Sequence, residues 1–425
     1  MTTKRKRVVI VGQGYVGLPL ALAASAAGCV VIGIDSDADR VRQLNEGSSP
    51  TTDVSDAQLK SAIADQSYSA NTSFADVGTA EVVVLCVPTP YRNQAPDLSY
   101  ITKAAQSVGS SMSPGVLIIL ESTTYPGTTE EVLMPILEQS SGLRHGIEFD
   151  LAFSPERIDP GNPIFGVHNT PKIVGGITAA ATQRACEFYS LFVDRVVAVS
   201  STSAAEMTKL LENTFRHINI ALVNELAILC REMGIDVWEV INAAASKPFG
   251  FMPFYPGPGV GGHCIPVDPM YLSWRVKQFG GSAKFIDLAR EINESMPLYC
   301  VARVQDLLND LGLPMKGSRI LVIGVAYKPN VSDVRESPAL MVIANLMTKF
   351  CNVSYLDPLV PNLTLPTGQM LQSVAENAIG TGTYDCAIIV TPHDCIDYPT
   401  VCNSSSVVFD TRNYLKAGTP KVVRL

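Results

Sequence analysis

The chain lacks the composition that would place it in several large classes of proteins. Only 17% of its 425 residues are charged and the formal net charge is −8, so a broad basic surface for nucleic acid or an anionic membrane is missing. No two of its ten cysteines form a C-x-x-C pair, and most lie inside apolar runs, which argues against a disulfide or zinc framework. We therefore expect buried reduced thiols, no metal and no nucleic-acid partner.

A long uninterrupted apolar run is also missing. The basic stretch at residues 4–7 and the apolar stretch after it resemble the start of a signal peptide, but Gly12, Gln13 and Gly14 end it far short of a membrane span. The sequence therefore predicts a cytoplasmic protein with no membrane partner. The residues that are present, 47% of them hydrophobic, are typical of a compact α/β chain with two or three domains.

Two regions with alternating strand and helix patterns flank a helical middle. From residue 7 to about residue 200, short β-branched runs alternate with helical segments, which predicts a mostly parallel sheet covered on both faces. Residues 201–234 have a helical period, with Ser203 and Glu206 as a capping box and Gly234 as the stop. A helix of that length bridges domains or builds a subunit interface.

The region after residue 316 repeats the first. VVIVGQGYVG parallels ILVIGVAYKP, VVIGID parallels VSYLD, and VVVLCVPTP parallels AIIVTPHD, in the same order. The fold class that we expect is α/β, with two doubly wound Rossmann-like domains joined by a helical central region that contains the long helix. The expected domains span residues 1–200, 201–315 and 316–425.

A dinucleotide fingerprint stands at the first predicted strand-to-helix turn. Gly12, Gly14 and Gly17 form G-x-G-x-x-G directly after a strand, and Asp35 ends the next strand. Such glycines let the backbone approach a pyrophosphate, while the aspartate accepts from ribose hydroxyls and repels a 2′-phosphate. We therefore predict NAD rather than NADP, with Arg40 as an adenosine-side contact. The alternatives are a plain tight turn with a capping aspartate, and an exposed helical arginine.

The second repeat keeps only Gly324 of this fingerprint. Its predicted strand ends carry Lys328, Asp333, Arg335 and Arg412 instead. Ligands of doubly wound sheets bind outside the carboxyl ends of the strands, so the cations Lys328, Arg335 and Arg412 would hold a second phosphate-bearing ligand. The alternative is a set of solvated loop charges.

The loop at residues 249–268 is rich in glycine and carries Cys264. Its glycines let backbone amides approach a ligand, and the prolines on either side of Asp268 indicate that a helix begins there. A thiol near a helix N-terminus ionises more easily, as a nucleophile requires. The alternatives are an inert cysteine and a capping role for Asp268. We do not expect a dyad of Cys264 with His263, because adjacent side chains seldom meet.

The long helix carries a polar face made of Glu206, Lys209, Asn213 and Arg216. It lies opposite an apolar face made of Met207, Leu210, Leu211 and Ile218. Periodicity alone predicts that the polar face is solvated. Glu156 follows a strand end, where it would serve as an acid or base or pair with Arg157.

Taken together, these motifs resemble the UDP-glucose/GDP-mannose dehydrogenase family. The segments that carry the resemblance are GQGYVG, VPTP, ESTTYPGT, SPERIDPG, the Lys209/Asn213 pair, GVGGHCIPVD and AYKPNVSDVRES. The resemblance implies an NAD-binding domain, a helical dimerisation domain and a UDP-sugar-binding domain in the three expected ranges. It also implies a homodimer, or a multiple of it, that oxidises the C6 alcohol of a UDP-sugar to a carboxylate and forms two NADH.

The same resemblance assigns roles to individual residues. The catalytic set is Cys264 as nucleophile, Lys209 as the cation for oxyanions, Asp268 as the carboxylate that orders water, and Asn213, Thr123 and Glu156 as further active-site contacts. The cofactor contacts are Gly12, Gly14, Tyr15, Val16, Gly17, Asp35, Arg40, Thr89, Thr123 and Arg335. The substrate contacts are Glu156, Arg157, Lys209, Asn213, Phe254, Tyr255, Gly259, Gly261, Lys328 and Arg412.

The chain departs from the UDP-glucose enzymes of the family at Pro160, where they carry a second glutamate, so the base for thioester hydrolysis stays open. SPERIDPGN and KPFGFMPFYPGPG are similar to the branch that acts on UDP-N-acetylated hexosamines, and most similar to its members that act on UDP-N-acetylglucosamine. The arginine that a neighbouring subunit supplies in relatives has no counterpart, and Lys247 is a speculative substitute. The alternatives are the same chemistry on UDP-glucose, UDP-N-acetylmannosamine or UDP-N-acetylgalactosamine, a two-electron dehydrogenase, and an inactive sensor of nucleotide sugars.

Overall fold

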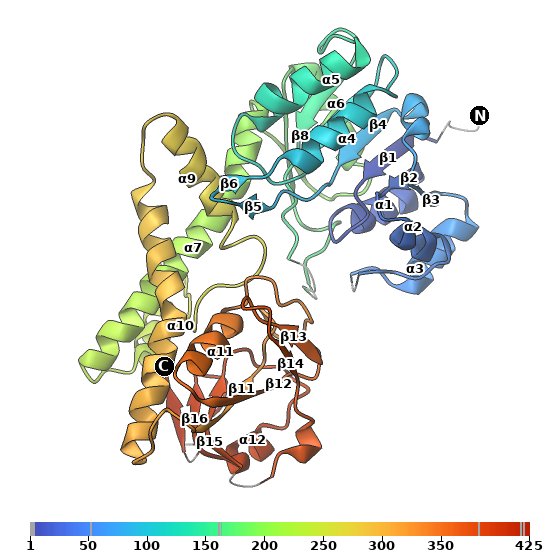
Figure 1. Cartoon of the computed structure of the whole chain (residues 1–425). Coiled ribbons are helices and arrows are strands. Elements are labelled where there is room, and N and C mark those ends of the chain that lie inside the picture. Colours follow the sequence, from blue (N-terminus) through green and yellow to red (C-terminus); the bar gives the residue numbers. More distant parts are fainter. Residues whose placement is uncertain are drawn as a thin grey trace. The chain divides into compact units, whose positions relative to one another are not determined.

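The computed structural model describes residues 5–51, 53–159, 162, 164–380, 383–416, 419 and 421–425. Lys4 and Pro160 lie outside the described residues. The chain divides into two compact units, Met1–Glu212 with Trp274–Gly281, and Asn213–Ser273 with Ser282–Leu425 (Figure 1). The three-domain division of the sequence analysis stays a prediction.

The first unit contains a sheet of eight described strands in the order β10-β9-β8-β7-β4-β1-β2-β3. All neighbours are parallel except β8 and β9. The strands are β1 (Arg7–Val11), β2 (Val30–Ile34), β3 (Tyr68–Asn71), β4 (Val82–Leu85), β7 (Leu117–Leu120), β8 (Asp150–Phe153), β9 (Lys172–Gly176) and β10 (Val196–Ala198). The expected mostly parallel sheet is confirmed.

Helices cover both faces of this sheet. They are α1 (Gly17–Ala26), α2 (Ala38–Asn45), α3 (Asp56–Ala64), α4 (Ser99–Gly109), α5 (Met134–Ser141) and α6 (Ala179–Tyr189). Val8 and Ile10 of β1 pack in one core with α1 and α6, while Val9 and Val11 pack in another with α4 and α5. The alternation arises because successive strand residues point to opposite faces, and apolar residues at every position bury both faces.

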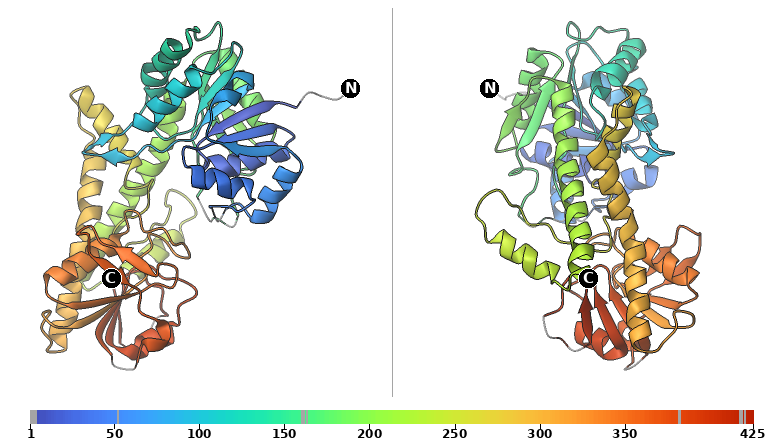
Figure 2. Two further views of the ribbon diagram at one scale, coloured as in Figure 1. Left: turned by 45° about the vertical axis from the view of Figure 1, so that its right-hand side comes forward. Right: turned by 90° about the vertical axis from the view of Figure 1, so that its left-hand side faces the viewer.

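The second unit contains a parallel sheet of five described strands in the order β12-β11-β15-β16-β17. These are β11 (Arg319–Ile323), β12 (Asn352–Leu356), β15 (Tyr384–Ile389), β16 (Ser405–Asp410) and β17 (Val422–Arg424). Its helices are α8 (Val237–Ala245), α10 (Lys284–Asp310), α11 (Pro338–Thr348) and α12 (Tyr398–Ser404). Helix α10 lies beside α11 and β15 (Figure 2), so the second sheet is also covered. The doubly wound α/β class is thus confirmed in both units.

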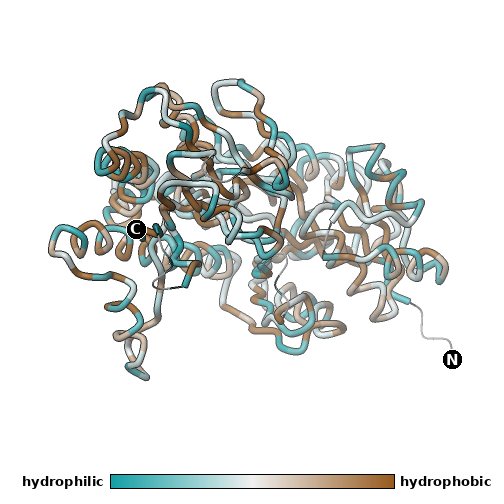
Figure 3. The backbone as a smooth tube through the Cα atoms, turned by 90° about the horizontal axis from the view of Figure 1, so that it is seen from below, coloured by the Kyte–Doolittle hydropathy of each residue, from teal (hydrophilic) through white to brown (hydrophobic). Residues whose placement is uncertain are grey.

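Two helices contribute residues to both units, namely α7 (Thr202–Glu232) and α9 (Asp268–Gln278). The remaining elements are short: β5 (Tyr91–Arg92), β6 (Ala95–Pro96), β13 (Asn362–Thr364), β14 (Met370–Gln372), and single turns at Ala75–Thr79, Thr129–Leu133 and Glu376–Ala378. Hydrophobic and hydrophilic residues alternate along individual helices (Figure 3), as expected of helices with one covered face.

The ends of α7 test the predicted capping signals. Gly234 has φ +70° and the N–H of Ile235 donates to the Cys230 carbonyl at 2.8 Å, so the predicted stop is confirmed. The predicted capping box is wrong, because Ser201 Oγ accepts from the Ala204 N–H at 3.1 Å. Glu206 binds a different segment of the first unit, described below.

Candidate active site

The three fingerprint glycines have three different surroundings in the first unit. A Cβ on Gly12, whose φ is +96°, would lie 2.5 Å from the Cys86 carbonyl oxygen, and one on Gly17 would lie 1.8 Å from that of Gly12. A Cβ on Gly14 would meet no atom within 4 Å. Gly12 and Gly17 therefore serve the tight turn and the packing of helix on strand, while Gly14 leaves its backbone open to a ligand. These are the three roles expected in a dinucleotide site.

Asp35 follows β2 and is held by the fingerprint turn. Its Oδ2 accepts from the Gln13 N–H at 2.8 Å, and its Oδ1 accepts from the Asp37 N–H at 3.0 Å. Arg40 pairs with Oδ2 at 3.1 Å while its own side chain stays 38% exposed. The carboxylate is thus fixed beside the open backbone of Gly14's turn, which fits the ribose of NAD. Tyr15 is exposed and Val16 half-buried on the same turn.

Further predicted residues follow the carboxyl ends of neighbouring strands in the same sheet. Thr89 comes after β4 and Thr123 after β7, and the Thr89 hydroxyl donates to the Thr123 carbonyl at 2.7 Å. Because β4 and β7 are adjacent and parallel, both threonines lie at the sheet edge that also carries Gly12. The structure therefore brings these two predicted contacts together beside the dinucleotide turn.

Glu156 follows β8 and is held as a carboxylate. Its Oε1 accepts from the N–H groups of Arg157 and Ile158 at 2.6 and 2.7 Å, and its Oε2 accepts from Lys172 Nζ at 3.1 Å. Burial raises the pKa of Glu156, but the Lys172 charge and these hydrogen bonds outweigh burial, and the Lys209 charge acts with them. The net pKa lies below the ordinary glutamate value, so Glu156 is suited to act as a fixed anion.

Lys172, at the start of β9, is a residue that the sequence analysis missed. Its Nζ lies 3.1 Å from Glu121 Oε1 and 3.1 Å from Glu156 Oε2, and the Tyr189 hydroxyl donates to Glu121. A single cation thus balances two buried carboxylates. The available signal was a charge at the start of the apolar strand PKIVGG. The guanidinium of Arg157 pairs with Glu212 at 2.6 Å, so the predicted Glu156–Arg157 side-chain pair is wrong.

The prediction that the polar face of α7 is solvated is wrong for three of its four residues, Glu206, Lys209 and Asn213. Glu206 is fully buried and Lys209 is 8% exposed, whereas Leu211 is 59% exposed. Glu206 accepts from the Gly127 and Thr129 N–H groups at 2.6 and 2.9 Å, and so caps the helical turn that begins at Thr129. Arg216 of that face is exposed and Leu210 of the predicted apolar face is fully buried, so the packed side of α7 takes residues from both predicted faces. Lys209 is therefore a buried cation, which suits a site that stabilises negative charge.

In the second unit the structure brings Cys264 and His263 together. Cys264 Sγ lies 2.9 Å from His263 Nδ1, and both side chains are half-buried. The prediction that these adjacent side chains do not meet is wrong. The backbone bends at residues 262–264, immediately before α9, so the two side chains are not directed apart as they would be in a strand.

Asp268 and Asn213 form a buried pair next to this loop. Asn213 Nδ2 donates to Asp268 Oδ2 at 2.5 Å, and the Asp268 N–H donates to the Cys264 carbonyl at 2.8 Å. Helix α9 begins at Asp268, as the prolines predicted, although the carboxylate is turned to Asn213. Cys264, Asp268 and Asn213 are therefore linked through direct hydrogen bonds within one unit.

The glycines of the loop pack against the second unit itself. A Cβ on Gly257 would lie 2.2 Å from an Arg412 nitrogen, one on Gly261 would lie 2.9 Å from Tyr327, and one on Gly259 would lie 3.2 Å from Pro338. The glycines thus allow close packing of protein on protein, where the sequence analysis expected close approach to a ligand. Contacts of Gly259 and Gly261 with substrate stay a prediction.

The other predicted substrate residues surround the same loop or follow strands of the second sheet. Arg412 follows β16, its Nε donates to the Val390 carbonyl at 3.0 Å, and burial lowers its pKa to about 10. Lys328 Nζ lies 5.9 Å from the Tyr327 ring centroid. Phe254 packs on Phe215 with ring centroids 5.6 Å apart. Two further predicted residues make polar contacts: Tyr255 with Asn242 at 3.2 Å and Arg335 with Asp333 at 2.6 Å.

Asp357 and His393 form a buried pair that the sequence analysis did not name. Asp357 follows β12 and its Oδ2 accepts from the Val325 N–H at 2.8 Å, while His393 Nε2 lies 3.1 Å from the same oxygen. Burial raises the pKa of Asp357, but the contact with His393 and the hydrogen bonds from N–H groups lower it by more. The net pKa therefore lies below the ordinary aspartate value. The available signal was the alignment of VSYLD with VVIGID.

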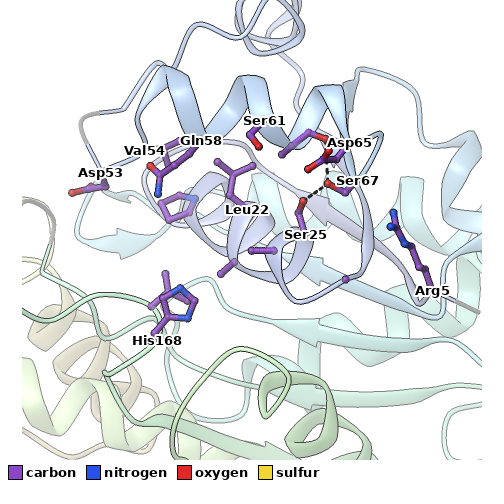
Figure 4. Close-up of a pocket in the computed structure, with 16 residues that line it drawn as sticks. Arg5, Leu22, Ser25, Asp53, Val54, Gln58, Ser61, Asp65, Ser67 and His168 are labelled. Atoms are coloured by element: carbon purple, nitrogen blue, oxygen red, sulfur yellow. Dashed lines mark hydrogen bonds between the residues drawn. The ribbon is translucent and has the colours of Figure 1, made fainter. Parts of the chain in front are cut away.

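A cavity of about 770 Å³ lies elsewhere on the first unit, against α1 and α3 (Figure 4). Arg5, Asp53, Gln58, Asp65 and His168 are among its lining residues. None of the predicted site residues lines it, and Gly28 in its wall precedes β2, at the edge of the sheet opposite the fingerprint. This cavity is therefore separate from the dinucleotide edge.

The fold and these sites define a class of protein. A doubly wound unit with an open glycine turn and a fixed ribose-side carboxylate is a dinucleotide-binding unit, and a second doubly wound unit carries a cysteine held against a histidine. Such a chain is an NAD-dependent oxidoreductase.

Comparison with known proteins gives the family. Models of the UDP-glucose/GDP-mannose dehydrogenase family match residues 6–193 (NAD binding domain), 203–295 (central domain) and 321–417 (UDP binding domain). The chain belongs to this family. It is an NAD-dependent UDP-sugar dehydrogenase, and the predictions of fold class and cofactor are confirmed.

Relatives that are named for different substrates are about equally similar to this chain. The chain is 34% identical over 416 residues to a UDP-N-acetyl-D-mannosamine dehydrogenase of Pyrococcus horikoshii, covering 96% of each chain. It is 36% identical over 395 residues to a UDP-N-acetyl-D-glucosamine 6-dehydrogenase of Pseudomonas aeruginosa, covering 92% of this chain and 91% of that one. A solved structure of the UDP-D-ManNAc dehydrogenase from Pyrococcus horikoshii has a TM-score of 0.89 at 32% identity, with 98% of each chain covered.

A search of the described residues for membrane-spanning segments gave none, since no helix there combines the necessary length and apolar character.

Proposed function

We propose that this chain oxidises the C6 hydroxymethyl group of UDP-N-acetylglucosamine to a carboxylate, with Cys264 as a covalent nucleophile. The observation that carries the proposal is the loop before α9, where Cys264 is half-buried against His263 and linked to the Asp268–Asn213 pair. NAD, held at the turn of Gly12, Gly14 and Gly17 and by Asp35, would supply the hydride acceptor for each of the two oxidations. The choice of UDP-N-acetylglucosamine over other UDP-sugars rests on SPERIDPGN and on the relative from Pseudomonas aeruginosa.

The chemistry proceeds through a bond to Cys264. The alcohol first loses a hydride and a proton and becomes an aldehyde. The Cys264 thiolate then adds to the aldehyde carbon, and the thiohemiacetal that forms loses a second hydride and a proton to leave a thioester. Water adds to the thioester carbon, the C–S bond breaks, and the carboxylate leaves with Cys264 regenerated as a thiolate. The mechanism needs a reduced thiol, which fits the cytoplasmic location that we propose.

Other residues support these steps. We assign Lys209 to the negative oxygen that develops at each tetrahedral stage, because a buried cation stabilises such charge strongly. Asp268 would order the attacking water, with Asn213 holding its carboxylate in place. Thr123 and Glu156 would contact the reacting end of the sugar, and the cations Lys328 and Arg412 would hold the diphosphate. Arg335 would reach the cofactor.

The proposal is tested by the NADH yield and by Cys264→Ser. Two NADH per sugar are expected from the wild-type chain, and Cys264→Ser should cut steady-state turnover by at least about a thousandfold, since a hydroxyl is a poorer nucleophile. The exposed Cys395 offers a matched control, and Cys395→Ser should retain wild-type turnover. Normal oxidation to the carboxylate by Cys264→Ser would exclude the covalent mechanism, and a yield of one NADH would identify a two-electron dehydrogenase.

The substrate is tested by a panel of UDP-sugars under one set of conditions. We expect the highest kcat/KM for UDP-N-acetylglucosamine, ahead of UDP-N-acetylmannosamine, UDP-N-acetylgalactosamine and UDP-glucose. A higher kcat/KM for UDP-N-acetylmannosamine would contradict this choice of substrate and favour the activity for which the Pyrococcus horikoshii relative is named.

We further propose that the chain forms a dimer, or a multiple of one, through α7. Its exposed large apolar residues recur every three, four or seven positions, which places them along one face: Met207, Leu211, Phe215, Leu222, Leu226 and Leu229. Sedimentation of the wild type should give a dimer or higher species, and Leu222→Glu with Leu226→Glu should lower the mass. An active wild-type monomer would exclude this assembly.

A further inference from the structure

The contact between Cys264 and His263 depends on the shape of the loop before α9. Gly262 has φ +90°, a conformation that L side chains rarely adopt, and its N–H donates to the Arg335 carbonyl at 3.1 Å. The Val267 and Asp268 N–H groups donate to the Cys264 carbonyl at 3.1 and 2.8 Å. Backbone hydrogen bonds therefore hold the bend on both sides of the two side chains, and place Sγ 2.9 Å from Nδ1.

An aromatic ring packs against the imidazole, and a carboxylate interacts with it electrostatically. The Tyr327 ring is edge-on to His263 with centroids 6.5 Å apart, and the Tyr327 N–H donates to the Asp333 carbonyl at 2.9 Å. The Asp333 carboxylate interacts electrostatically with His263 and pairs with Arg335 at 2.6 Å, and Lys328 Nζ lies 5.9 Å from the centroid of the Tyr327 ring.

The electrostatics of Asp333 link it to the imidazole. Burial raises the pKa of the Asp333 carboxyl, but hydrogen bonds from Arg335 and the charges of Arg335 and His263 lower it, and the net pKa lies below its ordinary value. The interaction is reciprocal, so the Asp333 carboxylate favours the protonated form of His263. The two cations Arg335 and Lys328 oppose it.

We propose that His263 is the base that takes the proton of the Cys264 thiol and holds the nucleophile as a thiolate paired with imidazolium. The inference rests on the proposed function of Cys264. The S–H bond breaks, its electron pair stays on Sγ, and the proton moves to Nδ1, which accepts it in the tautomer with hydrogen on Nε2. When water later cleaves the thioester, the departing thiolate meets the same imidazolium. His263 therefore acts directly on the reacting sulfur.

The test is alkylation of Cys264 by iodoacetamide at about pH 6, without any sugar or cofactor, followed by peptide mass spectrometry. An ordinary thiol is only about 0.3% ionised at that pH, so a paired thiolate reacts much faster. We expect His263→Asn to slow alkylation of Cys264 at least tenfold at about pH 6, and the rates to converge above about pH 9. The exposed Cys395, followed in the same samples, should react equally in both proteins.

A second pair of variants keeps the proposal testable if His263→Asn does not fold. Asp333→Asn leaves the histidine in place and should slow alkylation of Cys264 at about pH 6 by a smaller factor of about three. Asp385→Asn is its matched control, because Asp385 also accepts from the backbone N–H and the guanidinium of one arginine, Arg319, at the opposite edge of the sheet. Asp385→Asn should leave the alkylation rate unchanged.

The outcomes separate this inference from the proposed function. Equal alkylation of Cys264 in the wild type and in folded His263→Asn, or equal rates in Asp333→Asn and Asp385→Asn, would overturn the assignment of His263, even if the wild type formed two NADH per sugar. Slower alkylation of Cys264 in His263→Asn, together with a wild type that oxidises none of the UDP-sugars, would support the thiolate–imidazolium pair and contradict the proposed function.

Discussion

The two units contain the same frame around an aspartate and use it differently. In the first, the Gln13 N–H donates to Asp35 after β2 at 2.8 Å, and in the second, the Val325 N–H donates to Asp357 after β12 at 2.8 Å. The central strand order is also the same, β4-β1-β2 against β15-β11-β12. Beyond this frame they differ, since Asp35 pairs with the half-exposed Arg40 and Asp357 with the buried His393.

The glycines next to these aspartates show what the difference means. Gly12 and Gly324 are equivalent, and a Cβ on either would clash with a carbonyl oxygen, that of Cys86 at 2.5 Å or that of Thr391 at 1.8 Å. The turns differ two residues further on, where Gly14 has open space for a Cβ and the second unit has the buried Ala326. The first unit therefore leaves the turn beside its carboxylate open, whereas in the second unit the carboxylate is fully buried against His393. A duplicated strand arrangement thus supplies one dinucleotide site, and in the other copy the aspartate has become part of the core.

The largest effects are expected from adding a methyl group to a glycine of either turn. In the second unit the effect is on stability, and in the first it is on NAD affinity. Gly324→Ala combines the clash with Thr391 and a φ of +73°, and should destabilise the protein by about 3 kcal/mol or more while leaving NAD affinity unchanged in the folded fraction. Gly14→Ala should change stability by less than about 0.5 kcal/mol but weaken NAD binding about tenfold or more. Thermal unfolding and NAD titration of both variants check this, and equal profiles would remove the contrast between the units.

A smaller effect is expected at the buried aspartate. Asp357→Asn should cost about 2 kcal/mol at neutral pH, because a charge-assisted hydrogen bond to His393 is lost. The pKa of Asp357 is lowered in the folded state, so its stabilisation is present above the unfolded pKa of about 3.9 and is lost as pH falls through the folded pKa. The difference in Tm between wild type and Asp357→Asn should therefore shrink below about pH 4. A gap that stays constant down to about pH 2 would contradict this account.

The smallest effect on stability is expected at Asp35, the aspartate of the first unit. Asp35→Asn removes the charge that repels a 2′-phosphate and releases Arg40 toward it, so the ratio of kcat/KM for NADP to that for NAD should rise about tenfold. Stability should change little, since the amide oxygen can still accept from Gln13. An unchanged cofactor ratio would show that Asp35 does not determine the preference for NAD.

The sequence by itself determined the features that repeat along the chain. The strand and helix periods predicted the parallel sheets in both units, because burial of both faces requires nearly continuous apolar runs. The spacing of Gly12, Gly14, Gly17 and Asp35 predicted the dinucleotide turn, since few residues other than glycine fit a backbone with φ near +96° at Gly12. The motif GVGGHCIPVD was enough to single out Cys264.

Tertiary structure alone decided which groups meet. Periodicity predicted the helix α7 but could not tell which of its side chains pack, and Glu206 is buried because its carboxylate caps a segment more than seventy residues away. Lys172 joins Glu121 and Glu156 from three separate strands or strand ends. The contact of Cys264 with His263 needs a bend whose hydrogen-bond partners include Arg335. Such contacts depend on residues that are distant in sequence, and a local sequence pattern does not indicate which distant residues come together.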